Sequence, residues 1–398
     1  MSIPYALTIY PQGLDMYAAY ERPLTPLAGA GVWATFQGNA GHTGFVPVTL
    51  DSTKFAARYR YTPKTVDGVE LPISEIANAA GTLYFSTGGS CCDAAEYKTY
   101  ALKEASAFTA WSFNHRSEFA PAAHAPAIAG THVYVIGGEK GSTTVTGLDA
   151  ASGLLTRQLV GGNRTGYFPA PTAYGGVVYT PVNNDFSMVS AVDAATGYPI
   201  YSQGTGIQSA GWTPAVDENH FYQYAANLLY VSNRQTGQVS FAIAGPTSAA
   251  QQYKSVFAPL LAAPDTVVGI DERNVAVFDT ALRNLRWSLA GRFTRGAASD
   301  GNHLFIINNA GLSLEVRSIS DGTLLWQWQS ADFFTDFASE PLVTNNLVFV
   351  STMYATYAID RTTHATVWTY PASGTLSLSP NGTLFIKAPT KIVAIALH

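Results

Sequence analysis

The sequence predicts an all-β fold, a single eight-bladed β-propeller closed by a strand from the N-terminal part of the chain. Two observations carry this prediction. A unit of roughly 40 residues, made only of strand and turn signals, recurs along the chain, and such a repeat is typical of propeller blades. After the complete units, three strand-like segments remain at the C-terminal end, whereas one isolated strand-like segment stands at residues 55–61.

The recurring unit is clearest at 302–329, where two apolar strands, an Asp-Gly turn and a Trp-containing strand follow one another. The same order returns at 133–153, 177–197 and 347–363. With four strands, a to d, in each blade, we place seven blades at 71–113, 124–162, 170–204, 211–245, 257–291, 296–330 and 339–374. Residues 375–398 supply three strands of an eighth blade and 55–61 the fourth, so that closure removes the exposed sheet edges of an open array.

The outermost strand of each predicted blade carries a large side chain at one fixed place, four residues after the turn glycine or its equivalent. These side chains are Trp111, Arg157, Tyr201, Phe241, Trp287, Trp326, Trp368 and, in the closing strand, Tyr59. Seven of the eight are aromatic, Arg157 being the exception. We expect these rings to pack between neighbouring blades, where a flat ring buries a large area.

The N-terminal part divides into two segments. Residues 1–32 contain two strand-like stretches and a Pro/Ala/Gly-rich linker, and we interpret them as an arm on the propeller or the remnant of an upstream domain; the propeller itself spans 33–398. The glycine-rich stretch 37–44 lacks the Lys-Ser/Thr pair of a phosphate-binding loop. We therefore expect a structural loop in which Asn39 and His42 hydrogen-bond the backbone.

Composition excludes several classes of partner. The net charge is −5 and no basic cluster is present, so we expect no nucleic-acid partner. No apolar run approaches the 18 or so residues of a membrane span. The first residues have neither the charged nor the apolar region of a signal peptide. Only 12% of residues are charged, and Ser, Thr and Tyr are abundant, which favours a periplasmic or secreted location. The sequence does not specify the oligomeric state.

At the repeat residues the chain resembles a known family. Ala191–Gly197 (AVDAATG) and Ser320–Trp326 (SDGTLLW) resemble the repeat of PQQ-like, or quinoprotein-like, eight-bladed propellers. That family includes quinoprotein alcohol dehydrogenases and the lipoprotein subunit of the outer-membrane β-barrel assembly machine. The resemblance covers about 55–398 and implies the fold. It implies less about function, because these residues hold blades together.

The dehydrogenases of this family imply PQQ with calcium as cofactors. Cys91 and Cys92 resemble the adjacent-cysteine disulfide that methanol-type quinoprotein dehydrogenases place against PQQ. The Cα atoms of adjacent residues lie about 3.8 Å apart, below the usual disulfide range, so the pair forms either a tight strained ring or two free thiols. No equivalent of the family's calcium-binding residues is found, and we predict no cofactor and no metal site.

The topology places several polar and aromatic residues on one rim, because the d–a and b–c connections of a propeller emerge on the same face. Polar groups that converge beside aromatic walls are typical of ligand sites. The residues predicted to bind a ligand there are Glu75, Arg164, Trp212, Lys254, Asp336 and Glu340.

Two classes of function follow from this rim. The leading hypothesis is an extracytoplasmic binding or scaffolding propeller that recognises a glycan, a peptide or a protein. The alternative is an enzyme at the same face, a polysaccharide lyase before a PQQ- and calcium-dependent dehydrogenase. A lyase acting on uronates needs a cation, a base and an acid. The residues predicted to supply them are His115, His124, Tyr167 and Arg295. The sequence leaves open whether the chain is an enzyme.

Overall fold

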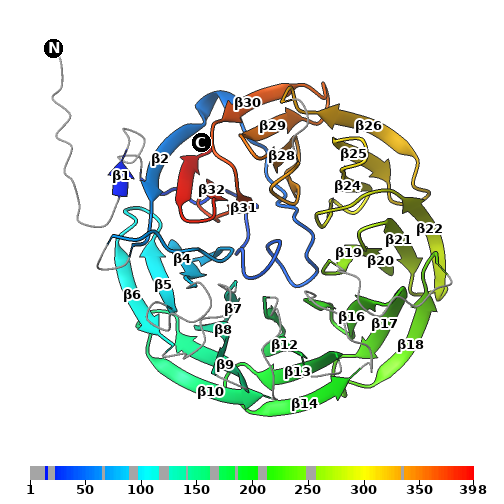
Figure 1. Cartoon of the computed structure of the whole chain (residues 1–398), viewed down its shortest axis with the longest axis horizontal. Coiled ribbons are helices and arrows are strands. Elements are labelled where there is room, and N and C mark those ends of the chain that lie inside the picture. Colours follow the sequence, from blue (N-terminus) through cyan, green and yellow to red (C-terminus); the bar gives the residue numbers. More distant parts are fainter. Residues whose placement is uncertain are drawn as a thin grey trace.

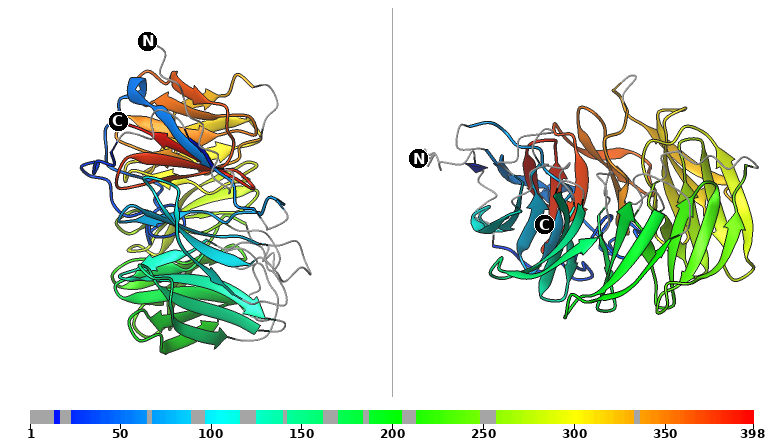
Figure 2. Two further views of the ribbon diagram at one scale, coloured as in Figure 1. Left: turned by 90° about the vertical axis from the view of Figure 1, so that its left-hand side faces the viewer. Right: turned by 60° about the horizontal axis from the view of Figure 1, so that its bottom comes forward.

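The computed structural model describes residues 14–16, 23–64, 68–88, 97–115, 125–139, 142–161, 170–183, 187–204, 213–247, 257–332 and 336–398. Within these ranges the chain forms eight antiparallel sheets arranged as a ring (Figure 1). Seen from the side, the strands of each blade run between the two faces of the ring (Figure 2). The predicted all-β propeller of eight blades is confirmed.

In blades 1 to 7 the four strands follow chain order from the channel to the outer rim. Blade 1 comprises β3 (Ala77–Ala79), β4 (Thr82–Ser86), β5 (Lys98–Lys103) and β6 (Thr109–Asn114), and blade 2 comprises β7 (Ala127–Ala129), β8 (His132–Glu139), β9 (Ser142–Asp149) and β10 (Leu155–Gly161). Blade 3 comprises β11 (Thr172–Tyr174), β12 (Val177–Asn183), β13 (Ser187–Asp193) and β14 (Pro199–Gly204), and blade 4 comprises β15 (Ala215–Val216), β16 (His220–Ala225), β17 (Leu228–Asn233) and β18 (Val239–Ala244). Blade 5 comprises β19 (Leu260–Ala263), β20 (Thr266–Ile270), β21 (Asn274–Asp279) and β22 (Asn284–Ala290). Blade 6 comprises β23 (Ala298–Ser299), β24 (His303–Asn308), β25 (Ser313–Ser318) and β26 (Leu324–Gln329). Blade 7 comprises β27 (Leu342–Val343), β28 (Leu347–Ser351), β29 (Thr356–Asp360) and β30 (Thr366–Tyr370).

Blade 8 is closed by the N-terminal part of the chain. Its inner strands are β31 (Thr375–Leu378), β32 (Thr383–Lys387) and β33 (Ile392–Ala396), and β2 (Ala56–Tyr61) pairs with β33 as the outer strand. A short fifth strand, β1 (Leu14–Met16), pairs with the outer edge of β2. A single 3₁₀ turn at Ser52–Lys54 precedes β2. The predicted closure is therefore present, and it joins residues more than 300 positions apart.

In blades 1 to 7, the turn before the outer strand has one residue in the left-handed backbone region. In blade 2, the Asp149 side chain accepts hydrogen bonds from the backbone N–H of Ala151 and Ser152, and Gly153 follows with φ +72°. A carboxylate that caps its own turn in this way favours a tight reversal. The equivalent positions with positive φ are Ala107, Gly153, Gly197, Gly237, Arg283, Gly322 and His364.

The large side chains of the outer strands pack against these turns in the next blade. The Trp111 indole donates a hydrogen bond of 3.0 Å to the Ala150 carbonyl, and a Cβ added at Gly153 would lie 2.5 Å from the Trp111 ring. Trp326 stacks on His364 with ring centroids 4.5 Å apart. The predicted packing between blades is confirmed.

Arg157, the one non-aromatic member of this set, fills the same place. Its Nε donates to the Thr196 carbonyl, and its aliphatic carbons lie over Gly197 as the rings lie over the other turn residues. The long apolar stem of an arginine can cover such a surface while the charged head stays near solvent. The position therefore requires a large side chain that covers the turn of the next blade, and an aromatic ring is one way to provide it.

The central channel is filled by the segment Trp33–Leu50, which we call the channel segment (Figure 1). It bonds the innermost strands of blades 1 to 7 in chain order. The contacts are Trp33 with Asn78, Ala34 with Ile128, Thr35 with Pro171, Ala40 with Val216, Gly41 with Leu261, Thr43 with Ser299 and Gly44 with Val343. Its apolar side chains, with Val46, Val48 and Leu50 among them, pack into the core of blades 7 and 8.

The structural loop expected at 37–44 is part of this channel segment. The buried His42 ring contacts the Pro259 carbonyl through Nδ1 at 2.9 Å and the Thr172 hydroxyl through Nε2 at 3.3 Å. The Asn39 side chain accepts from the backbone N–H of Gly41. Burial lowers the pKa of His42 to about 4, so the ring is neutral near pH 7. The expectation that both side chains bond the backbone is confirmed.

Candidate functional site

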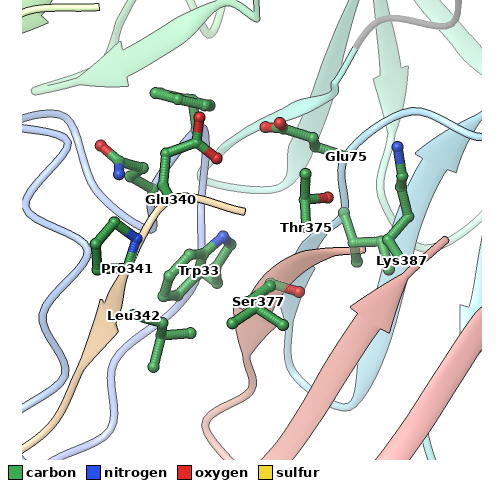
Figure 3. Close-up of a pocket in the computed structure, with 12 residues that line it drawn as sticks. Trp33, Glu75, Glu340, Pro341, Leu342, Thr375, Ser377 and Lys387 are labelled. Atoms are coloured by element: carbon green, nitrogen blue, oxygen red, sulfur yellow. The ribbon is translucent and has the colours of Figure 1, made fainter. Parts of the chain in front are cut away.

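A pocket lies on the d–a/b–c face, where blades 7, 8 and 1 meet the channel segment (Figure 3). It encloses about 390 Å³ of space between atoms, part of it open to solvent, and its enclosed part has room for about one water-sized group. Its lining residues are Trp33, Phe36, Gln37, Glu75, Ile76, Glu340, Pro341, Leu342, Thr375, Leu376, Ser377 and Lys387.

Each side of the pocket comes from a different part of the chain. Glu75 and Glu340 stand just before the innermost strands β3 and β27, at equivalent places in blades 1 and 7. Lys387 is the last residue of β32, and Ser377 lies on the innermost strand β31. Trp33, from the channel segment, lies between the two blades (Figure 3). The site is therefore assembled by ring closure.

The charged groups of the pocket act on one another without direct ion pairs. Within the described part of the chain, no carboxylate oxygen of Glu75 or Glu340 lies within 4.0 Å of a lysine, arginine or histidine nitrogen. Burial, and after it the negative charge of Glu340, raise the pKa of Glu75 to about 7 against the opposing charges of Lys387 and Arg295. Burial likewise lowers the pKa of Lys387, opposed by the two carboxylates. These groups thus form one electrostatic unit.

Arg295 is held at the edge of this unit. Its Nε donates to the Phe337 carbonyl at 3.1 Å and its Nη1 to the Thr294 carbonyl at 3.0 Å. Asp336 lies next to Phe337 on the rim, is exposed, and accepts a hydrogen bond of 2.8 Å from Asn309. Arg295 therefore contributes its charge to the pocket, whereas Asp336 belongs to the surrounding rim surface.

His115 is not brought to this pocket. Its Nε2 lies 2.7 Å from the Thr99 hydroxyl, and its ring packs on Tyr97 and Phe113 at centroid distances of 4.4 and 5.1 Å. Burial lowers its pKa to about 4. The imidazole is thus neutral near pH 7 and enclosed by its own blade.

Seven other predicted residues lie outside the described residues, and their arrangement remains a prediction. They are Cys91, Cys92, His124, Arg164, Tyr167, Trp212 and Lys254.

Of the residues that line the pocket, sequence reasoning named only Glu75 and Glu340, and Lys387, Trp33 and Ser377 are among those it missed. Lys387 precedes a b–c connection, so the same topological rule that selected Glu75 would have found it. Trp33 and Ser377 carry no such signal, because the path of the channel segment and the direction of an inner-strand hydroxyl depend on the assembled ring.

The described part of the chain has neither a metal-binding cluster nor a membrane-spanning helix. No three His, Cys, Asp or Glu residues gather there in an arrangement that could hold a metal ion. The same residues form no helix of the length and apolarity needed to cross a membrane.

The chain is an eight-bladed ring closed by an N-terminal strand, and Asp-x-x-x-Gly turns precede the outer strands of blades 2 and 3 (Asp149–Gly153 and Asp193–Gly197), as in the PQQ-like repeat. The family model described as outer membrane protein assembly factor BamB matches residues 185–397, which is more than half of the chain. The chain belongs to this family.

Solved structures show the same fold. The crystal structure of BamB from Moraxella catarrhalis aligns with a TM-score of 0.62 and 11% identity, covering 82% of this chain and 99% of that one. A europium-containing methanol dehydrogenase aligns with a TM-score of 0.67 and 14% identity, covering 89% of each chain. At these identities the likeness concerns the fold alone. A search of curated proteins gave no match.

Proposed function

We propose that this chain is a scaffolding propeller that binds a protein partner on its d–a/b–c face, outside the cytoplasm. The family it belongs to is described as an outer membrane protein assembly factor, and assembly factors act by contacting other proteins. A protein is the partner we favour among the glycan, peptide and protein ligands that the rim suggests.

The filled channel carries this proposal. The channel segment occupies the axis, and little of the remaining pocket takes a water-sized group. This supports a partner that inserts one small group over PQQ, a three-ring molecule, or a sugar residue. A small polar pocket within a broad rim suits instead the tip of one side chain on a docking protein.

The polysaccharide lyase gains no specific support. It would require an acid or base beside the cation, but His115 is enclosed within blade 1, away from Arg295, and Arg295 already donates to two backbone carbonyls. We therefore place the scaffold first and advance no reaction.

Site-specific photo-crosslinking in the native host tests the proposal. A benzophenone amino acid is placed at Asp336, on the exposed d–a rim, and a control at Leu282, 72% exposed at a c–d turn on the opposite face. We expect a discrete protein adduct from Asp336 and none from Leu282. Equal labelling of both positions, or of neither, would overturn the proposal. Fractionation of the adduct identifies the compartment in which the contact forms.

A further inference from the structure

We propose that the pocket binds the ammonium group of a lysine side chain, presented by the protein partner, between Glu75 and Glu340. This inference rests on the proposed function, since it assumes a partner that docks on the same face. It adds the chemical group that this partner inserts.

The first argument is the state of the two carboxylates. Glu75 and Glu340 reach into the pocket from blades on either side of blade 8, with both carboxyl groups at the same end of the pocket (Figure 3). Within the described residues, neither side chain accepts a hydrogen bond or forms an ion pair. Both side chains are only partly buried, but two like charges that share one pocket disfavour each other's ionisation. Such a pair is therefore suited to an incoming cation.

The second argument is independent of charge. Ser377 is only 3% exposed, lines the pocket, and its Oγ has no hydrogen-bond partner. Buried hydroxyls without a partner are rare and call for an explanation. An ammonium group has three donors and no acceptor, and the two carboxylates supply acceptors at one end of the pocket, while Ser377 lines its other end (Figure 3). The Trp33 indole in the same wall provides an aromatic surface of the kind that attracts cations.

Size selects lysine over arginine. The enclosed space holds about one water-sized group. An ammonium is compact, whereas a guanidinium is a planar fork with five donors. The stem of the lysine would extend through the open part of the pocket to the partner.

The positive charges of Lys387 and Arg295 allow a cationic ligand to be distinguished from an anionic one by the direction in which substitutions change its affinity. Both side chains carry positive charge near Glu75 and so oppose the incoming cation, although neither forms an ion pair with Glu75. Neutralising Lys387 should therefore strengthen binding of a cation, and neutralising either glutamate should weaken it. A ligand with a carboxylate would give the opposite signs in all three variants.

Protonation of Glu75 predicts how binding of the cation should depend on pH. The pKa of Glu75 is raised to about 7 by burial and by Glu340, against Lys387 and Arg295. A bound ammonium replaces the proton on this carboxyl group. Binding should thus strengthen as the pH rises from 6 to 8.

The experiment uses n-butylammonium as the probe, with n-butylguanidinium and butyrate as comparisons. The seven tryptophans are labelled with 5-fluorotryptophan and followed by ¹⁹F NMR, with Trp33→Phe identifying the Trp33 signal. We expect n-butylammonium to shift this signal saturably and more tightly than n-butylguanidinium. Glu340→Gln and Glu75→Gln should each weaken binding about tenfold, and Lys387→Met should tighten it several-fold.

Glu272→Gln is the matched control, because Glu272 is an exposed carboxylate on a b–c turn of the same face, outside the pocket. It should leave binding of the probe unchanged, and thermal melts verify that every variant is folded. The inference is overturned if n-butylammonium leaves the Trp33 signal unmoved, if butyrate binds instead with reversed signs, or if Glu272→Gln weakens binding as much as the pocket variants.

The two proposals can fail separately. If the Asp336 adduct forms but its yield is unchanged by Glu75→Gln and Glu340→Gln, and n-butylammonium does not bind, the lysine inference is wrong and the scaffold stands. If no adduct forms at Asp336, the scaffold proposal is wrong whatever the probe does.

Discussion

The eight large side chains of the outer strands, which we call the belt, differ from the central pocket in how their polar groups are bonded. In the belt, Trp111 and Trp287 each donate an indole hydrogen bond of 3.0 Å to the turn of the next blade and pack on it. In the pocket, the buried Ser377 hydroxyl and the half-buried Glu75 and Glu340 carboxylates have no direct partner among the described residues. Belt contacts are complete within the chain and stabilise it, whereas pocket groups are left available, as expected where function overrides local stability.

The largest effect should come from removing a belt ring. Trp111→Ala leaves a cavity between blades 1 and 2 and leaves the Ala150 carbonyl without its donor, so we expect a loss of about 3–5 kcal/mol in the free energy of unfolding. Denaturant unfolding measures it. Phe108→Ala, in the same blade but at a side chain that is 49% exposed, should cost far less. Equal losses would show that the belt does not hold the blades together.

The belt also requires glycine on the receiving side. Gly153 and Gly176 both have positive φ, at +72° and +76°, but an added Cβ meets the Trp111 ring at 2.5 Å in the first case and nothing within 4 Å in the second. We expect Gly153→Ala to cost about 2–3 kcal/mol, and Gly176→Ala about 1 kcal/mol from backbone strain alone. A chemical denaturation series on both variants measures the difference, and its absence would rule out tight packing at this turn.

The channel segment adds a buried polar group that is fully bonded. The pKa of His42 falls from 6.5 to about 4 on folding, so between these values the unfolded chain binds a proton that the folded chain excludes. Stability should therefore be complete above pH 6.5 and fall by about 2–3 kcal/mol as the pH drops to 4. NMR titration of the His42 ring, together with unfolding at several pH values, checks this. A ring that titrates near 6.5 would contradict it.

The smallest expected change in the free energy of unfolding comes from the pocket, where a substitution should stabilise the protein and not destabilise it. Because the pKa of Glu75 rises from 4.5 to about 7 on folding, the unfolded chain loses this proton before the folded chain does, so the cost to stability builds up between pH 4.5 and 7 and is complete above pH 7. Glu75→Gln should thus stabilise the protein by roughly 1–2 kcal/mol at pH 8, with the gain vanishing near pH 4. Melting curves at the two pH values measure it. A loss of stability at pH 8 would place Glu75 with the structural residues.

The blades and the belt could be predicted from the sequence because each repeat carries its own signals. Alternating strands, the Asp-containing turns and the large side chain four residues after each turn all lie within one unit, as with Asp149, Gly153 and Arg157. Closure followed from simple counting, since three strands at one end and one at the other complete a blade. These features depend on short stretches of chain whose period is visible without the fold.

The pocket was decided by the tertiary structure. The sequence could place Glu75 and Glu340 on one face, because the order of strands fixes which connections share a rim. The sequence could not predict that Trp33 lies between them, that Ser377 lacks a hydrogen-bond partner or that the pKa of Glu75 is raised. Those properties arise only when ring closure brings residues 33, 75, 340 and 377 together and removes them from water, since burial and electrostatic coupling depend on the surrounding atoms and not on sequence spacing.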